Sequence, residues 1–467
     1  MAPGARVGRL AALCVCLTLA SGDALSGTPD APRWWKGNTH THSWWSDGDA
    51  PPELIALWYA ERGYDFLVFS EHNVIADGEA WYPLDDPSRS ERKSRAVRDA
   101  YARYRTVFGD RWVVDRRSGE GIEVRLKPLD EFRALFERAG EFILIQGEEI
   151  TSSVQSHPVH MNGVNLVEHI DPLAGESVAE TLQLNLDAVR RQADRFGRPM
   201  LMHVNHPNFH FAMQAEDFFY LDHAPGDGFF EMYNGHPGVG VNGDFQHMGT
   251  ERMWDVILSW RLGPLERSVL YGVAVDDAHE YTRWGPGETN PGRGWVMVRA
   301  THLTPDSITA AMRAGDFYNS TGVTLRTLDM SPDAIRLEVE PADGVNYRIE
   351  FVGTRADADL RGRVEQVHLD AEAHDDDLSL PAQAMLQKGI QRHDVVRYGD
   401  RVGEVLARVS GTVAEYRLRG DEIYVRARIL SDRLHPNPHA PGDVEMAWTQ
   451  PLVPERSGSP TEAAMPQ

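Results

Sequence analysis

The chain has 467 residues, of which 70 are acidic and 47 are basic, so its formal net charge at pH 7 is −23. A chain of this length suggests more than one domain. Because nucleic acids and anionic membrane surfaces are bound by basic faces, the acidic balance argues against both as partners. The two cysteines, Cys14 and Cys16, lie near the N-terminus, so no disulfide and no thiolate metal ligand is expected in the rest of the chain.

The N-terminal residues have the pattern of a signal peptide, which we assign to residues 1–26. Arg6 and Arg9 precede an apolar run over residues 10–20, and small residues suited to cleavage follow it. The run is too short to span a bilayer, and no later stretch is apolar enough to do so. The sequence therefore predicts a periplasmic or secreted protein without a membrane anchor.

Short apolar runs then recur along the chain, and most of them end in histidine, aspartate or glutamate. They cover residues 65–70, 141–146, 157–166, 199–208, 228–235, 269–275 and 294–300. Runs of this kind, bounded by turn residues, are typical of strands buried on both faces. Helical stretches lie between them, among them residues 52–62, 182–196 and 304–313. Alternating strands and helices predict an α/β fold with a parallel sheet or barrel.

One connection, residues 79–140, is much longer than an ordinary link between a strand and a helix. It contains helical stretches at residues 89–104 and 129–139, with a glycine turn at residues 119–121. Because this insertion follows the second strand of the barrel, it would lie near the mouth of a site at the strand ends. It would serve there as a lid or specificity element, or else as a packing extension.

From about residue 323 apolar and polar residues alternate, for example at residues 334–340, 346–352 and 422–429. This alternation is typical of half-buried antiparallel strands. It predicts a C-terminal antiparallel β-sandwich over residues 323–454, either a stabilising flank or a binding module. Residues 455–467 are rich in Ser, Pro and Glu and are expected to be disordered.

The most informative segment, residues 37–48, places His40 and His42 two positions apart and Asp47 five positions later. In a strand, side chains at i and i+2 point to the same side, so both imidazoles could bind one cation. Imidazole and carboxylate suit zinc, iron and manganese. A lone His-x-His pair is a weak signal, but the later runs end in the same residue types. In barrels the chemistry gathers at these C-terminal strand ends.

Together these motifs resemble the PHP (polymerase and histidinol phosphatase) superfamily of metal-dependent hydrolases. The matching elements are His40-x-His42-x4-Asp47, Glu71-His72-Asn73, Gly147-x-Glu149-Ile-Thr, His160, His206-Pro207 and Asp277-Ala-His279. A secreted branch that includes carbaryl hydrolase-like proteins is similar at Glu231-Met-Tyr-Asn-Gly235, Tyr318-Asn-Ser-Thr-Gly322 and Ala447-Trp-Thr-Gln-Pro451. The resemblance implies a distorted (β/α)7 barrel over residues 33–322.

The resemblance also implies two or three divalent metal ions, which would be zinc, manganese or iron. One ion would be held by His40, His42, Glu149 and Asp277. Glu149 would bridge to a second ion at His160 and His206, and a third would be held by Asp47, His72 and His279. Divalent ions a few ångströms apart can lower the pKa of a shared water towards neutrality. The implied nucleophile is a metal-bridging hydroxide held by Glu149 and Asp277.

Neighbouring residues compete for some of these roles. We favour Glu149 over Glu148 as the ligand, because alternation along a strand lets only one of the two point inward. His160 is preferred to His157, and His203 is assigned a structural role.

Two positions depart from the family pattern. Asn38 stands where many members carry Asp, and Glu71 replaces the commoner Asp before a histidine. Neither is a predicted metal ligand, so we expect them to tune metal preference from outside the ligand set. No partner can be named for His210, His236 or His247, and a surface or pocket-rim role is expected for these three.

Substrate contacts are predicted at Arg283, Arg293 and Asn234. The two arginines follow the Asp277 motif in a loop rich in Gly and Pro. Such a loop could bring a guanidinium to a phosphate or carboxylate, which its fork binds in a bidentate manner. The alternative is an ordinary surface arginine.

The sequence thus predicts a secreted metal-dependent hydrolase of a small-molecule ester, with a phosphoesterase preferred. A carbamate or carboxylic ester hydrolase is the close alternative, because the same hydroxide attacks a carbonyl carbon. A different class of function is a non-catalytic secreted binding protein, in which the barrel keeps its metals for stability and the β-domain binds.

Overall fold

The computed structural model describes residues 31–119, 121–368 and 392–454. The predicted signal peptide (residues 1–26) and the predicted disordered tail (residues 455–467) lie outside the described residues. Within them, no helix is long and apolar enough to cross a membrane. The described chain is a mixed α/β protein with one large sheet and few helices, which agrees with the predicted fold class.

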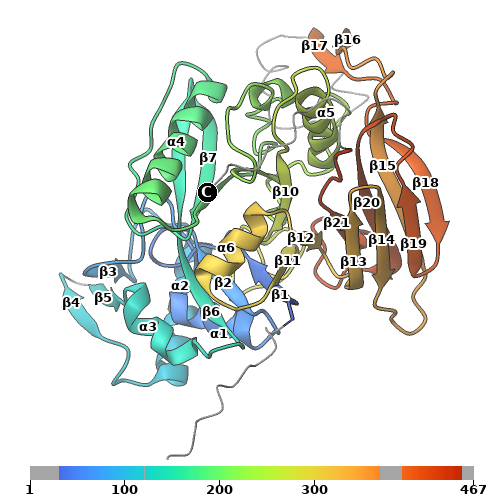
Figure 1. Cartoon of the computed structure of the whole chain (residues 1–467). Coiled ribbons are helices and arrows are strands. Elements are labelled where there is room, and N and C mark those ends of the chain that lie inside the picture. The colour runs from blue at the N-terminus through green and yellow to red at the C-terminus, as the bar shows by residue number, and fades with distance from the viewer. Residues whose placement is uncertain (1–30, 120, 369–391, 455–467) are drawn as a thin grey trace, which may run out of the picture. The chain divides into compact units, whose positions relative to one another are not determined.

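Strands and helices alternate through the first part of the chain (Figure 1). The helices outside the insertion are α1 (Pro52–Ala60), α4 (Val178–Phe196), the 3-10 helix η1 (Ala215–Phe218), α5 (Thr250–Leu262) and α6 (Pro305–Arg313). The strands are β1 (Arg33–Asn38), β2 (Phe66–Phe69), β6 (Ile143–Val154), β7 (His157–Val164), β8 (Leu201–Val204), β9 (Gly228–Asn234), β10 (Tyr271–Val275), β11 (Trp295–Ala300) and β12 (Phe317–Ser320).

The large sheet is mixed, whereas the alternation of elements predicted parallel strands. Strands β1, β2 and β6 are parallel, as are β8, β9 and β10, but β7 runs antiparallel to both of its neighbours. The reason is local. Strand β6 continues past the predicted run to Val154, and only Gln155 and Ser156 separate it from β7. Both residues have positive φ, 49° and 71°, and a two-residue turn of this kind can join only antiparallel strands.

The sheet curls around one interior. A single buried cluster takes side chains from β1, β2 and every strand from β6 to β12, among them Trp35, Val68, Val164, Val273 and Phe317. Strand β10 stands last in the pairing order, yet its end returns to the end of β1 through a parallel bridge between Thr41 and Ala278. The C-terminal ends of β1 and β10 therefore meet.

The insertion at residues 79–140 folds on the outer side of α1 and β2. Its strands β3 (Ala80–Pro83), β4 (Asp115–Ser118) and β5 (Gly121–Leu126) form a separate small sheet. Its helices are α2 (Glu91–Phe108) and α3 (Leu129–Phe136). Val97 and Phe132 of these helices belong to one buried cluster with Ile55 and Phe69. Their packing against this outer face fixes the position of the start of α2.

The C-terminal strands continue the large sheet through antiparallel pairing of β12 with β21 (Val444–Thr449). Beyond β21 follow β20 (Glu422–Leu434), β15 (Tyr347–Arg355) and β18 (Glu404–Ser410). A second sheet of β13 (Leu325–Ser331), β14 (Ala334–Val339) and β19 (Val413–Arg417) shares a buried core with them that includes Ile335, Ile349 and Ala427 (Figure 1). Strands β16 (Arg363–His368) and β17 (Arg392–Arg397) pair as a two-stranded sheet.

Candidate metal centre

The fold brings all nine predicted ligand residues to one end of the strands. His40 and His42 follow β1, His72 follows β2, His206 follows β8, and Asp277 and His279 follow β10. Glu149 and His160 lie within β6 and β7, because these two strands run on beyond their parallel neighbours. The donor atoms form four overlapping groups, and within each group all donor atoms lie within 4.8 Å of one another. Together the four groups contain nine residues: His40, His42, Asp47, His72, Glu149, His160, His206, Asp277 and His279.

Four donor atoms form the most buried part of the cluster. Nε2 of His40 lies 3.1 Å from Nε2 of His42 and 3.3 Å from Oε2 of Glu149. It also lies 3.3 Å from Oδ1 of Asp277. Nε2 of His42 lies 3.1 Å from the same Glu149 oxygen and 3.4 Å from the same Asp277 oxygen. Ligand atoms around a tetrahedral zinc ion with bonds of about 2.0–2.1 Å are about 3.3 Å apart. These donors therefore have the spacing of ligands around one ion.

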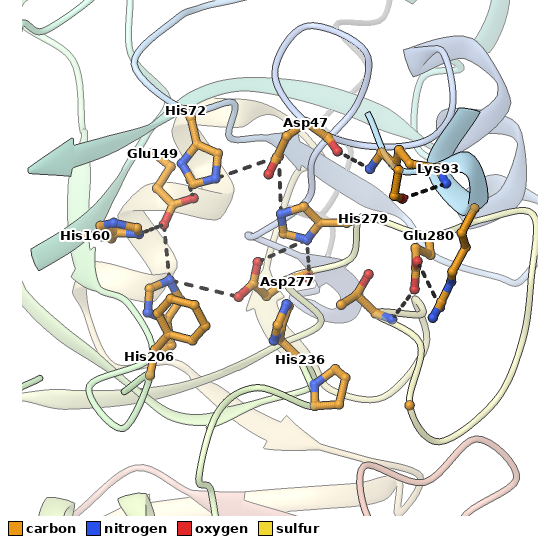
Figure 2. A pocket seen from close by; sticks show the side chains of 16 residues that line it. Asp47, His72, Lys93, Glu149, His160, His206, His236, Asp277, His279 and Glu280 are labelled. Atoms are coloured by element: carbon orange, nitrogen blue, oxygen red, sulfur yellow. Dashed lines mark hydrogen bonds and ion pairs between the residues drawn. The ribbon is translucent and has the colours of Figure 1, made fainter. Parts of the chain in front are cut away.

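Glu149 directs its two oxygens to different donor atoms. Figure 2 shows the oxygen that contacts His160 and His206. Oε2 faces His40 and His42, whereas Oε1 lies 2.9 Å from Nδ1 of His160 and 3.2 Å from Nε2 of His206. A carboxylate in this position can bridge two cations. His206 also approaches Asp277, whose Oδ2 lies 4.0 Å from its Nε2.

Asp47 is the centre of the outermost group. Its Oδ1 lies 3.3 Å from Nε2 of His279 and 3.7 Å from Nε2 of His72. Nδ1 of His42 is also 3.7 Å away, so this ring contacts the inner group through one nitrogen and the outer group through the other. The Asp47 side chain is 57% exposed, which places this group at the solvent side of the cluster.

The charges within the cluster favour a bound cation or a protonated histidine. Burial lowers the pKa of His42, but hydrogen bonds to Asp277 and Glu149 outweigh it and raise the pKa to about 10. Burial raises the pKa of the Glu149 and Asp277 carboxyls, yet the surrounding histidines hold both well below their usual range. The carboxylates therefore stay ionised in a buried site, which is the condition that a cation site requires.

Two of the predicted ligand residues have a positive φ angle. The φ angle is 51° at Asp277 and 25° at His206, a region that non-glycine residues seldom adopt. Asp277 donates its backbone N–H to the carbonyl oxygen of His40 over 3.1 Å, and this bond helps to hold the turned conformation. Local strain of this kind is concentrated at functional sites.

Several buried residues hold the ligand side chains in place. Glu231, in β9, accepts from Nδ1 of His40 over 2.7 Å. Glu71 accepts from the backbone N–H and the hydroxyl of Ser43, in the turn that carries the first ligands. Asn38 accepts from the backbone N–H of His40 over 3.0 Å. Histidine ligands in metal sites usually have such partners on the other ring nitrogen.

No protein-family model matches the chain, and neither does any curated protein. Among solved structures, the chain is similar to the crystal structure of a two-domain protein from Bacteroides vulgatus that contains a predicted PHP-like metal-dependent phosphoesterase. The sequence identity is 13%, the alignment covers 91% of this chain and 97% of that chain, and the TM-score is 0.34. A TM-score this low leaves too little shared backbone for the likeness to bear on the activity.

A cavity of about 540 Å³ opens over the cluster (Figure 2). One part of its wall is formed by Phe209, His236 and Pro237, and another by Glu280, Gly287 and Thr289. The insertion supplies Ser90, Arg92 and Lys93 from the start of α2. Arg92 forms ion pairs with Glu280 and Glu288, whereas Lys93 donates to the backbone carbonyl of Asp47. No carboxylate of the described residues forms an ion pair with Lys93.

The predicted substrate residues have other roles in this structure. The Arg283 guanidinium lies 3.2 Å from Glu280 and 3.1 Å from Glu288, so it is paired within its own loop. Arg293 is fully buried and donates to the backbone carbonyls of Gly235 and Gly285. A Gly- and Pro-rich loop does not reveal which way its side chains point, so the sequence could not separate these cases.

Asn234 is also buried and faces the ligand residues instead of the cavity. It donates to Glu231 over 2.8 Å and to Asp277 over 3.1 Å. Asp276 supports the same region, since it accepts from the backbone N–H groups of Gly292, Arg293 and Gly294.

The choices between neighbouring residues agree with the placement of their side chains. Glu148 accepts from the backbone N–H of Ile170, away from the cluster, and His157 is exposed. His203 is buried beside Glu231, and no metal-type donor group contains it. The sequence analysis did not identify Lys93 as part of the cavity, and it placed His236 only at a surface or rim.

Proposed function

We propose that the protein is an exported, metal-dependent phosphoesterase with a distorted barrel of the PHP type. The proposal is supported above all by the spacing of the four inner donor atoms. His40, His42, Glu149 and Asp277 come from three separate parts of the chain, yet the Nε2 atom of each histidine lies 3.1–3.4 Å from the other three donor atoms, and all four residues are buried. Bound divalent ions would supply Lewis acidity and lower the pKa of a water molecule at this position.

The chain's own residues prepare the site for an anionic substrate. Glu231 fixes the ring of His40, and the two Glu149 oxygens hold two donor groups at a constant separation. Three divalent ions would carry more charge than the four carboxylates Asp47, Glu149, Glu231 and Asp277 together, so a site loaded with three ions has a net positive charge. Lys93 adds a cation at the rim. An anionic phosphate ester is therefore attracted more strongly than a neutral ester.

The test compares three substrates on the full mature chain after loading with zinc or manganese. We expect hydrolysis of p-nitrophenyl phosphate in preference to p-nitrophenyl acetate and a p-nitrophenyl carbamate. His40→Ala and Asp277→Ala should lower the rate by at least about 100-fold, because each removes an inner donor. His302→Ala is the control, since His302 is exposed and lies in the turn before α6.

Two results would contradict the proposal in different ways. Preferred hydrolysis of the acetate or carbamate would assign the same centre to carboxylic esters. Stoichiometric metal without hydrolysis of any of the three would favour the non-catalytic binding protein. Export is tested separately, by finding the mature N-terminus near residue 26 in the periplasmic or secreted fraction.

A further inference from the structure

His236 faces the cavity but belongs to none of the four donor groups. The backbone N–H of Gly238 donates to its Nδ1 over 2.9 Å. A nitrogen that accepts this bond must offer its lone pair, so the proton of the neutral ring is on Nε2.

The Nε2–H group is directed at no described acceptor. The His236 ring lies at the cavity wall next to Asp277 (Figure 2). Its centroid is 5.7 Å from that of His279 and 5.8 Å from that of Phe209, and both contacts are edge-on. A neutral, oriented N–H beside a cation centre suits an oxygen atom of a bound ligand, because it adds a hydrogen bond without repelling the ions.

The backbone of His236 is held from two sides. The His236 backbone N–H donates to Oδ1 of Asn234 over 2.8 Å. Nε2 of His439, in the loop between β20 and β21, lies 3.2 Å from the His236 carbonyl oxygen and 3.1 Å from that of Val239. Because carbonyl oxygens only accept, His439 donates. Asn437, in the same loop, donates to the carbonyl of Pro291 over 3.0 Å, so the loop is also tied to the segment that precedes β11.

We propose that His236 is a substrate-binding residue that donates a hydrogen bond from Nε2 to an oxygen of the substrate phosphoryl group. His439 is a positioning residue for it, so the C-terminal strands contribute to the site through their connecting loop. This inference rests on the proposed function, because it assigns the phosphoryl group as the ligand.

The experiment measures the binding of inorganic phosphate to the zinc-loaded full chain by calorimetry. His236→Ala and His236→Phe should weaken phosphate binding by about 10-fold, the usual effect of losing a hydrogen bond to a charged group. The zinc content should stay that of the wild type. His236→Gln should recover most of the affinity, because its amide can donate from nearly the same place. His302→Ala is the matched control.

Ring ¹⁵N spectra of the wild-type protein give a second readout that does not depend on a variant. We expect the signals of His236 to show the Nε2–H tautomer and to shift when phosphate is added. His439→Phe should weaken phosphate binding by a smaller factor, roughly 3-fold, and broaden the His236 signals, because the donor remains but its position is less fixed. An unchanged affinity in His439→Phe would overturn the positioning role.

The results separate this inference from the proposed function. A wild-type protein that binds no phosphate overturns both. Wild-type binding that His236→Phe leaves within about 2-fold overturns only the role of His236, and so does an Nδ1–H tautomer. Loss of zinc from the His236 variants would indicate that His236 is a metal ligand, and this result would also overturn its role as a hydrogen-bond donor to the substrate. If both Ala and Phe variants fail to fold, the affinity of His236→Gln and the ring spectra decide.

Discussion

The carboxylate of Glu231 accepts a hydrogen bond from Nδ1 of His40 over 2.7 Å, and both side chains are fully buried. Because this bond places the ring proton on Nδ1, the Nε2 atom of His40 carries the lone pair and faces the other predicted metal ligands. The second Glu231 oxygen accepts from the backbone N–H of His206 over 2.7 Å and from the Asn234 amide over 2.8 Å. One carboxylate thus orients two predicted ligand residues and the strand end that leads to His236.

Glu231→Gln should therefore weaken metal binding without removing a ligand. The amide nitrogen of glutamine cannot accept a hydrogen bond. In place of Oε1 it would face the Nδ1–H of His40, and in place of Oε2 it would face the N–H groups of both His206 and Asn234, so either placement leaves donors without an acceptor. Changes to such supporting partners typically lower metal affinity about 10- to 100-fold. Competition with a chromophoric chelator measures this change.

Glu148→Gln is the control for this experiment, because Glu148 is an equally buried carboxylate whose hydrogen bond with Ile170 lies outside the cluster. An affinity that changes equally in both variants would show that Glu231 has no special role in metal binding.

Metal affinity should rise with pH through the neutral range. Without metal, hydrogen bonds raise the pKa of His42 from 6.5 to about 10 despite its burial, so His42 is protonated at pH 7. A metal ion must displace this proton, and each displaced proton gives about a tenfold gain in affinity per pH unit. Calorimetry in buffers of different ionisation enthalpy should detect release of at least about one proton at pH 7.

The raised pKa of His42 also makes the stability of the metal-free protein depend on pH. The folded-state pKa of His42, about 10, exceeds its ordinary value of 6.5, so the stabilisation of the metal-free fold by this proton is full below about pH 6.5 and is lost as the pH rises from there to about 10. Metal-loaded protein should not show this loss. A metal affinity that stays constant or falls between pH 6 and pH 8 would contradict the assignment of His42 as a metal ligand.

The sequence analysis located the cluster because its residues follow local rules. Two histidines that are two residues apart after a strand point to the same side. Because the strands belong to one sheet, side chains at the ends of different strands meet at the same edge of that sheet. This reasoning holds even though β7 is antiparallel, since His160 lies near the start of β7 and the hairpin returns that end to Glu149. The mixed sheet itself was missed, because the turn at Gln155 and Ser156 contains none of the glycine that usually signals a tight hairpin.

Residues whose role depends on distant contacts were not predictable in this way. Arg293 has the chemistry of an anion-binding residue, yet its guanidinium is buried against the backbone carbonyls of Gly235, after β9, and of Gly285, in its own loop. Lys93 lies in a charged helix with nothing to distinguish it from its neighbours, and only the packing of the insertion brings it to the cavity. His236 requires knowledge of the Gly238 N–H that orients its ring.

Lys93→Met should impair the use of anionic esters selectively. Its ammonium lines the cavity, donates one hydrogen bond to the Asp47 carbonyl and has no ion-pair partner among the described carboxylates, so its other N–H groups can contact a phosphoryl oxygen. We expect kcat/KM for p-nitrophenyl phosphate to fall about 5- to 10-fold, the effect of losing one charge-assisted hydrogen bond at a partly exposed position. Hydrolysis of a neutral acetate ester should be nearly unchanged.

Arg95→Met is the control for Lys93, because Arg95 lies on the same helix and is 71% exposed outside the cavity. Equal losses for both substrates in Lys93→Met would show that the insertion acts through packing alone.

Arg426 should couple the C-terminal strands to the rest of the fold. It lies in β20, is fully buried, and its guanidinium is 2.8 Å from Asp255 and 2.7 Å from Glu251, both in α5. Arg426→Met leaves the buried Asp255 without its counter-ion, which should lower the free energy of unfolding by about 3–5 kcal/mol. Urea denaturation followed by fluorescence measures the change.

The double variant Arg426→Met with Asp255→Leu should recover much of this loss, because it removes the unpaired charge together with its partner. Residual destabilisation should remain, since Tyr424 donates to Asp255 over 2.7 Å and would lose its acceptor. If the C-terminal strands fold independently of α5, Arg426→Met will instead separate the unfolding curve into two transitions while the metal centre stays intact. A single transition shifted to lower urea supports one cooperative unit, in which the loop that carries His439 is held rigidly against the site.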